Sequence, residues 1–222
     1  MTNYARLIGI SMILAFIAGV LSVSPAVDSA NYLTDAAQQH AQVMLAALAQ
    51  FTMAVFYIVA AVLLFTVIKS THQIAALNFL AFKMSAATLV IFSTVLLISV
   101  YVISAEFLQA MPAEDTAFTA IGAVLKITRD QLNHVFMIWL LCIGNLFLFG
   151  VFLKTKLVPI WLSAIGIFGA ILSSVASGLV LFGIYDIITP EYLAMNAPTA
   201  IADLALSVLL IVKGFNYSAT PS

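Results

Sequence analysis

Long apolar stretches separated by short polar segments run through the whole chain. A helix of about 20 mainly apolar residues crosses a hydrocarbon core about 30 Å thick. Six stretches reach or approach that length: 7–23, 41–68, 75–105, 132–153, 159–183 and 197–214. They must be helices, because lipid offers no partner for an unpaired backbone amide, and their unbroken apolar character excludes the alternating strands of a membrane barrel. The pattern predicts an all-α, six-helix transmembrane bundle that forms one integral membrane domain over residues 1–222.

The basic residues between these stretches predict the orientation of the bundle. Six crossings leave both termini on one side of the membrane. That side would carry six basic residues and the other side two: Arg6, Lys69, Lys83, Lys154, Lys156 and Lys213 against Lys126 and Arg129. Cytoplasmic loops carry the excess of lysine and arginine, so both termini are predicted to be cytoplasmic. The first stretch is interpreted as a retained span, because a single basic residue precedes it and residues 23–26 form a poor signal-peptide cleavage pattern.

The polar segment between the third and fourth spans has a helical pattern of its own. Phe118, Ile121, Gly122 and Leu125 recur at helical spacing. This predicts a short amphipathic helix that lies on the outer surface. Two roles are open for it: a lid over an outward cavity, or an interfacial helix that only completes the fold.

Composition and motifs narrow the function classes. The chain is 64% hydrophobic and 8% charged, with a net charge of −1, so it has no basic patch for nucleic acid. Cys142 is the single cysteine, and the three histidines (His40, His72 and His134) have no metal-ligand spacing. Neither a nucleophile elbow nor a phosphate-binding loop is present. We therefore expect no metal and no cofactor, and the sequence leans away from an enzyme.

Small residues at regular spacing predict close helix packing. The fifth span carries a row of four residues, each four apart: Gly166, Ala170, Ser174 and Gly178. A second row, Gly169, Ser173 and Ser177, suggests that this helix touches neighbours on two sides near the centre of the bundle, and Gly19 belongs to a shorter row in the first span. Such rows let helix backbones approach closely in lipid. Packing within one chain and a homodimer face are both compatible with them.

Asp203 is the position most in need of an explanation, because a carboxylate inside a span costs a few kcal/mol unless it is paired or faces a cavity. Counting from the expected helix ends places Asp203 in the outer half with three other polar residues: Gln50, Glu106 and His134. Asn145 is expected near the midplane and Lys83 on the cytoplasmic side. Three interpretations remain: Asp203 pairs with Gln50, His134 or a lysine and fixes helix register; the cluster lines an outward pocket for a small ligand or lipid head group; or Asp203 and His134 relay protons or bind a metal.

Several short motifs resemble a known family. They are Ala5-Arg6-Leu7-Ile8-Gly9, Leu63-Leu64-Phe65 leading to Lys69, Phe82-Lys83, His134 with Gly150, and Val212-Lys213-Gly214. With them the chain resembles the bacterial membrane proteins grouped as domain of unknown function 4386. That family usually has arginine where Lys83 stands and glutamate where Asp203 stands, which implies a charge-dependent role for both. Asn145 stands where many relatives are expected to have histidine, which weakens any histidine-based chemistry.

Together these features predict a multi-pass protein of the bacterial inner membrane. Its expected partners are membrane lipid and either a hydrophobic small molecule or another membrane protein. The favoured function is a non-enzymatic bundle that binds a hydrophobic ligand or acts as an interaction or accessory protein. The alternative is a small proton-coupled transporter using Asp203. A third interpretation is an intramembrane redox or lipid-modifying enzyme.

Overall fold

The structure, a computed structural model, describes residues 2–109 and 115–217. Within these residues every regular element is helical, and six helices are long and apolar enough to cross a membrane. The long helices are α1 (Thr2–Leu21), α4 (His40–Ile68), α5 (Gln73–Phe107), α7 (Met137–Thr155), α8 (Ile160–Leu181) and α9 (Pro190–Val212). The shorter ones are α2 (Pro25–Asp28), α3 (Tyr32–Gln38), α6 (Asp115–Gln131) and the π-helical turn η2 (Leu132–Phe136). The predicted all-α bundle with six apolar helices is confirmed.

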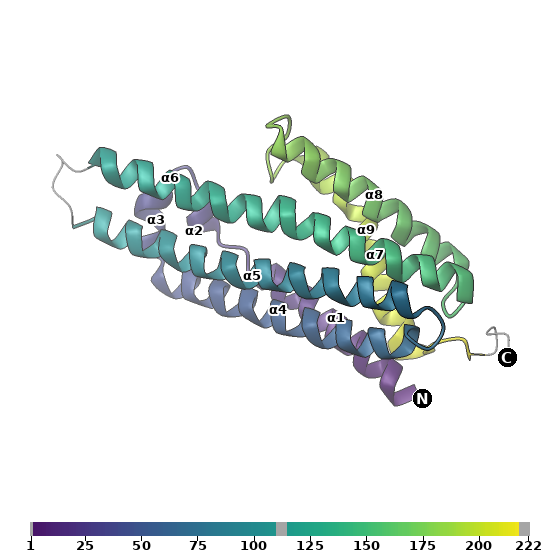
Figure 1. The fold of residues 1–222 in the computed structure, drawn as a ribbon. Helices are drawn as coiled ribbons and strands as arrows, with labels where there is room; N and C mark the ends of the chain where they lie inside the picture. The colour runs from purple at the N-terminus through teal and green to yellow at the C-terminus, as the bar shows by residue number, and fades with distance from the viewer. Residues whose placement is uncertain (1, 110–114, 218–222) are drawn as a thin grey trace.

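The six long helices form a closed ring. Each packs mainly against two others, in the order α1, α4, α5, α7, α8, α9, and the ring closes where α9 meets α1. Both termini lie at one end of the bundle, which we call the terminal end, and α2, α3 and α6 lie toward the opposite, distal end (Figure 1). A ring of this kind leaves an interior that side chains from non-neighbouring helices can reach.

The amphipathic helix predicted between the third and fourth spans is present as α6, but it does not lie separately on the surface. It continues through η2 into α7, so that one helical rod runs from Thr116 to Thr155. The side of α6 that carries Gly122 packs against α5 and α3, where a side chain at Gly122 would meet the Tyr32 hydroxyl at 2.9 Å, whereas Ile121 is 50% exposed. Packing against these neighbours favours a rod standing on the bundle over a helix lying flat.

The two small-residue rows of α8 face its two neighbours. The first row faces α7: a side chain at Gly166 would overlap the Phe149 ring, and the Trp139 indole N–H donates to the Ser174 carbonyl at 2.9 Å. Gly169 and Ser173 of the second row face α9, where a Cβ at Gly169 would lie 2.6 Å from the Thr199 amide nitrogen. Ser177, at the end of this row, donates to the His134 carbonyl of η2 at 2.8 Å. The helix is nevertheless not central, because its main contacts are with α7, η2 and α9. Two close neighbours explain two rows without a central position.

The last spanning helix begins earlier than the apolar pattern predicts. Thr189 caps α9, and Pro190 occupies the first helical turn, where its missing N–H costs nothing. Pro198, which the sequence places near the helix start, instead lies inside the helix, beside the close approach to Gly169. This earlier start changes the depth of every residue on α9.

Candidate functional site

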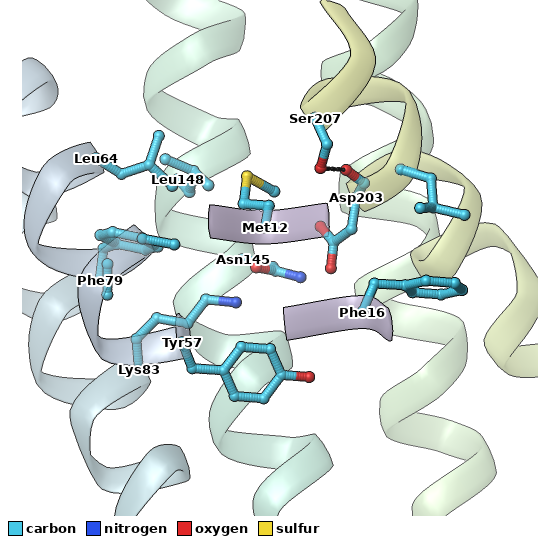
Figure 2. A pocket seen from close by; sticks show the side chains of 13 residues that line it. Met12, Phe16, Tyr57, Leu64, Phe79, Lys83, Asn145, Leu148, Asp203 and Ser207 are labelled. Atoms are coloured by element: carbon cyan, nitrogen blue, oxygen red, sulfur yellow. Dashed lines mark hydrogen bonds between the residues drawn. The ribbon is translucent and has the colours of Figure 1, made fainter. Parts of the chain in front are cut away.

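A cavity of about 80 Å³ lies inside the ring, and five of the six long helices line it. We call it the midplane cavity. Its polar side chains come from four helices: Tyr57 on α4, Lys83 on α5, Asn145 on α7, and Asp203 with Ser207 on α9 (Figure 2). Apolar side chains complete the wall, with Met12 and Phe16 on α1 and Leu204 on α9. The cavity exceeds the space that one water needs.

Three of the polar residues lie at a similar distance from the terminal end of the bundle. Lys83, Asn145 and Asp203 lie nine or ten positions from the terminal ends of α5, α7 and α9. At 1.5 Å per residue this is about 14–15 Å, or half of a hydrocarbon core about 30 Å thick. Because α9 starts at Pro190 rather than Ala197, Asp203 lies thirteen positions from the distal end of its helix instead of the expected six, and so lies past the middle of α9. Lys83 and Asp203, expected at different depths, line the same cavity.

Lys83 and Asp203 reach the cavity from opposite sides, and their charged ends point into it (Figure 2). The two groups interact electrostatically. In the part of the chain that the structure describes, the ion pairs within 4.0 Å both involve Arg129, so Lys83 and Asp203 do not form one. Two opposite charges thus face one space without direct contact.

The neutral polar groups of the cavity differ in how far they are already bonded. The Asn145 amide nitrogen points toward the Asp203 carboxylate, whereas its carbonyl oxygen is buried without a hydrogen-bond partner (Figure 2). The Ser207 hydroxyl donates to the Asp203 backbone carbonyl at 2.6 Å, one turn back on α9. Asn145 therefore retains an unused acceptor beside the two charges. The hydroxyl proton of Ser207 is already donated to the backbone.

The cavity is not sealed from the perimeter of the bundle. Asn145 and Ser207 are 1% exposed, but Lys83, Asp203 and Tyr57 are only partly buried. Phe16, which lines the cavity, is 41% exposed. The wall formed by α1 therefore reaches from the cavity to the surface of the ring.

Two of the predicted polar residues, Gln50 and His134, lie in a second space nearer the distal end. This distal cavity has a volume of about 340 Å³. The Gln50 side-chain amide donates to Asn133 Oδ1 at 3.0 Å, and His134 Nδ1 lies 3.3 Å from the Tyr192 hydroxyl. The interpretation in which Asp203 pairs with Gln50 or His134 is therefore wrong.

Glu106 belongs to neither cavity. It is exposed near the end of α5 and lines neither of the two spaces. The six predicted polar residues thus separate into a midplane group (Lys83, Asn145, Asp203), a distal group (Gln50, His134) and Glu106 alone. Asn145 lies ten positions from the terminal end of α7.

Tyr57 and Ser207 were not singled out from the sequence, although a signal for each exists. Tyr57 lies seven positions after Gln50, and Ser207 four positions after Asp203. These spacings place each pair on one helix face. A polar residue inside a span therefore indicates the helix face on which other polar residues lie.

Arg129 organises the distal end and was counted from the sequence only as a loop charge. Its side chain is 5% exposed and pairs with Asp28 at 2.7 Å and with Asp130 at 3.0 Å. Lys126 donates to the Asp28 carbonyl at 3.2 Å and to the Ser29 carbonyl at 3.0 Å. Both basic residues of this end therefore hold α2 and the segment after it against the bundle.

Metal ligation has no geometric support in residues 2–109 and 115–217, where no three histidine, cysteine or acidic side chains gather as a metal site requires. In comparison with known proteins, a family model described as domain of unknown function (DUF4386) matches residues 7–214. No curated protein and no solved structure matches the chain.

Proposed function

The chain belongs to the family described as domain of unknown function (DUF4386). Because that description assigns no activity, we propose a function from the midplane cavity. The proposed function is the binding of a small molecule with a zwitterionic head and an apolar body. One observation carries this proposal. Lys83 and Asp203 face the same cavity from opposite sides and do not pair within 4.0 Å among the described residues.

Charge chemistry explains why such an arrangement suits a ligand. An unpaired charge at the bilayer centre costs a few kcal/mol, and membrane-embedded ionisable residues usually mark functional sites. A ligand that carries a carboxylate and an ammonium group satisfies Lys83 and Asp203 at once, and Asn145 supplies a further acceptor for the ammonium group. Charge-assisted hydrogen bonds of this kind are the strong ones.

The rest of the cavity sets the size and the character of the ligand. Met12, Phe16 and Leu204 present apolar surface on the side of α1 and α9. A volume of about 80 Å³ is well below the roughly 300–1,000 Å³ of pockets that enclose a whole ligand, so in this proposal the cavity holds the charged head alone. The apolar body then extends past the partly exposed Phe16 toward lipid. The protein acts in this proposal as a non-enzymatic binding bundle.

The cellular setting follows from the charge asymmetry of the sequence. We place the protein in the inner membrane of a bacterium with both termini in the cytoplasm, so that the distal end faces outward. Lys126 and Arg129, the two basic residues of the distal end, are occupied by backbone carbonyls and carboxylates. The charge of Arg129 is therefore locally compensated by the Asp28 and Asp130 carboxylates, which supports that orientation.

A second candidate, a small proton-coupled carrier that uses Asp203, has one observation in its favour. The distal cavity is lined by α1, α4 and α7, which also line the midplane cavity. A carrier needs binding at the midplane and access from a membrane face. The two candidates share the site and differ in whether the ligand crosses the membrane.

Calorimetry on the full chain in lipid nanodiscs tests the binding proposal with three probes of matched length: norleucine, hexanoate and hexylamine. We expect norleucine to bind at least about tenfold more tightly than either singly charged probe, because it alone engages both Lys83 and Asp203. Equal affinity for all three probes would show that the two charges do not recognise a zwitterion. For the carrier candidate, norleucine uptake into proteoliposomes must also depend on a proton gradient.

A further inference from the structure

The distal cavity contains polar groups that the bundle itself does not satisfy. Gln50 and Arg129 line it and are 2% and 4% exposed. Gln50 Oε1 and Arg129 Nε are buried and have no hydrogen-bond partner within the protein. An unsatisfied buried polar atom costs about 1–3 kcal/mol, so native proteins place water or a solute beside it.

The space and its lining fit water. A volume of about 340 Å³ is far above the minimum for one molecule, and Asn133 and His134 add further polar surface. The cavity also reaches Ser22 and Val23 at the distal end of α1 and Ile188 in the loop before α9. It therefore extends from the distal surface toward the middle of the bundle.

The distal and midplane cavities follow one another on the same helix faces. On α4, Met53 lines the distal cavity and Tyr57 the midplane cavity, four positions or about 6 Å apart. On α1, Gly19 and Phe16 stand in the same relation, three positions or about 4.5 Å apart. On α1 and α4 about one helical turn separates the two spaces, and on α7 seven positions, or about 10 Å, lie between Ile138 and Asn145.

Two buried methionines line the distal cavity, and one of them, Met53, is the residue of α4 that lies one turn from Tyr57 of the midplane cavity. Met53 and Met137 line the distal cavity and belong to one buried apolar cluster with Ala18 and Ala54. Gly19 brings α1 so close that an added Cβ would lie 3.0 Å from the Met53 sulfur. We call Met53 and Met137 the methionine layer. Methionine has three rotatable bonds and adapts its shape without backbone movement.

We propose that the distal cavity is a water-filled vestibule through which the ligand reaches the midplane cavity, and that the methionine layer closes this route in the structure. That the zwitterionic ligand uses this route rests on the proposed function, whereas the vestibule and its closure rest on the two cavities and on the side chains between them. The route starts at the distal end and passes Asn133 and Met53 before it reaches Asp203.

The sole cysteine makes cysteine accessibility a direct test. In a Cys142→Ala background, single cysteines are introduced as Asn133→Cys in the vestibule, Ser207→Cys in the midplane cavity, and Phe92→Cys on the lipid face, where Phe92 is 60% exposed. Proteoliposomes are treated from each side with a membrane-impermeant cationic methanethiosulfonate. A thiol in water reacts through its thiolate, and a thiol in an apolar environment reacts slowly.

We expect Asn133→Cys to react at least about tenfold faster than Phe92→Cys, and from the distal side only. Ser207→Cys should be protected in the presence of the intact methionine layer. Adding Met53→Ala should speed its reaction from the distal side at least about tenfold, whereas the volume-conserving Met53→Leu should not. Met137→Ala provides a second opening of the layer if Met53→Ala does not yield a monodisperse protein.

Two results would overturn the proposal. One is an Asn133→Cys thiol that reacts no faster than the lipid-facing control, since the distal cavity would then hold no bulk-connected water. The other is a Ser207→Cys thiol whose rate is unchanged by both Met53→Ala and Met137→Ala. Because no ligand is present in these reactions, either failure is distinguishable from a failure of norleucine to bind.

Discussion

Lys83 on α5 and Asp203 on α9 face each other across the middle of the ring, although α5 and α9 are not neighbours in it. Lys83 and Asp203 therefore do not join two helices that already pack against each other. Neither residue forms an ion pair within 4.0 Å in the described parts of the chain. This geometry separates a binding site from a structural cross-link, and the two roles predict opposite effects on stability.

Removing both charges should not destabilise the empty protein. We expect the double variant Lys83→Met with Asp203→Asn to have an unfolding free energy that is unchanged or higher by about 1–4 kcal/mol, because apolar or neutral replacements of buried charges are often stabilising. Thermal unfolding in detergent, with exposed Lys69→Met and Asp186→Asn as matched controls, measures the change. A loss of more than about 1 kcal/mol would favour a structural role for the pair.

Filling the midplane cavity should block binding without touching a charge. Ala60 lines the cavity and is 6% exposed, so Ala60→Leu places a larger side chain where the ligand is expected. Norleucine affinity should fall by at least about tenfold while stability holds, since cavity filling is commonly stabilising. The neighbouring Val59→Leu, at a position that is 38% exposed, is the control. Unchanged affinity in Ala60→Leu would move the ligand out of this cavity.

The close approach of α8 to α9 predicts a sharp difference between two glycines. Gly169→Ala sets a Cβ 2.6 Å from the Thr199 backbone nitrogen and should lower the unfolding free energy by about 1–3 kcal/mol through overpacking. Gly150→Ala, where nothing lies within 4 Å of the new Cβ, should be neutral or stabilising by up to about 1 kcal/mol through helix propensity. Equal melting temperatures for the two variants would contradict the observed packing.

The buried Arg129 should be a stability determinant of the distal end. Arg129→Met leaves the Asp28 and Asp130 carboxylates without their partner and should cost about 3–5 kcal/mol, the range for breaking a buried pair. Limited proteolysis should then cut near α2 faster than in the wild type. Exposed Lys154→Met serves as the control, and adding Asp28→Asn should recover part of the loss. A wild-type proteolysis pattern in Arg129→Met would exclude this role.

The membrane-spanning architecture was predictable because apolar length alone determines which segments cross lipid. All six predicted spans agree with the helices to within two residues at their C-terminal ends, whereas the starts of α1, α7 and α9 differ from the prediction by five to seven residues. The short helices α2 and α3 were not predictable from local pattern. The Ser104 hydroxyl donates to the Leu33 carbonyl and accepts from the Ala37 amide, so distant contacts stabilise α3.

The candidate site was predictable in its residues but not in its grouping. Lys83, Asn145 and Asp203 stand out as polar positions in apolar runs, whereas their common depth depends on where each helix begins. The Thr189 cap and Pro190 start α9 seven residues before Ala197, which moves Asp203 by about 10 Å, from the outer half to the midplane. The start of α9, rather than the chemistry of the residues, therefore determines that Asp203 shares a cavity with Lys83 and Asn145.

The most direct test of the central claim is the probe preference of two single-charge variants, measured by calorimetry in nanodiscs. Lys83→Met removes the protein group that binds the ligand carboxylate, so this variant should bind norleucine no more tightly than hexylamine. Asp203→Asn removes the group that binds the ligand ammonium, so this variant should bind norleucine no more tightly than hexanoate. The wild type should keep a preference of at least about tenfold over both singly charged probes. A zwitterion preference that survives both substitutions would contradict the assignment of Lys83 and Asp203 as the two halves of one binding site.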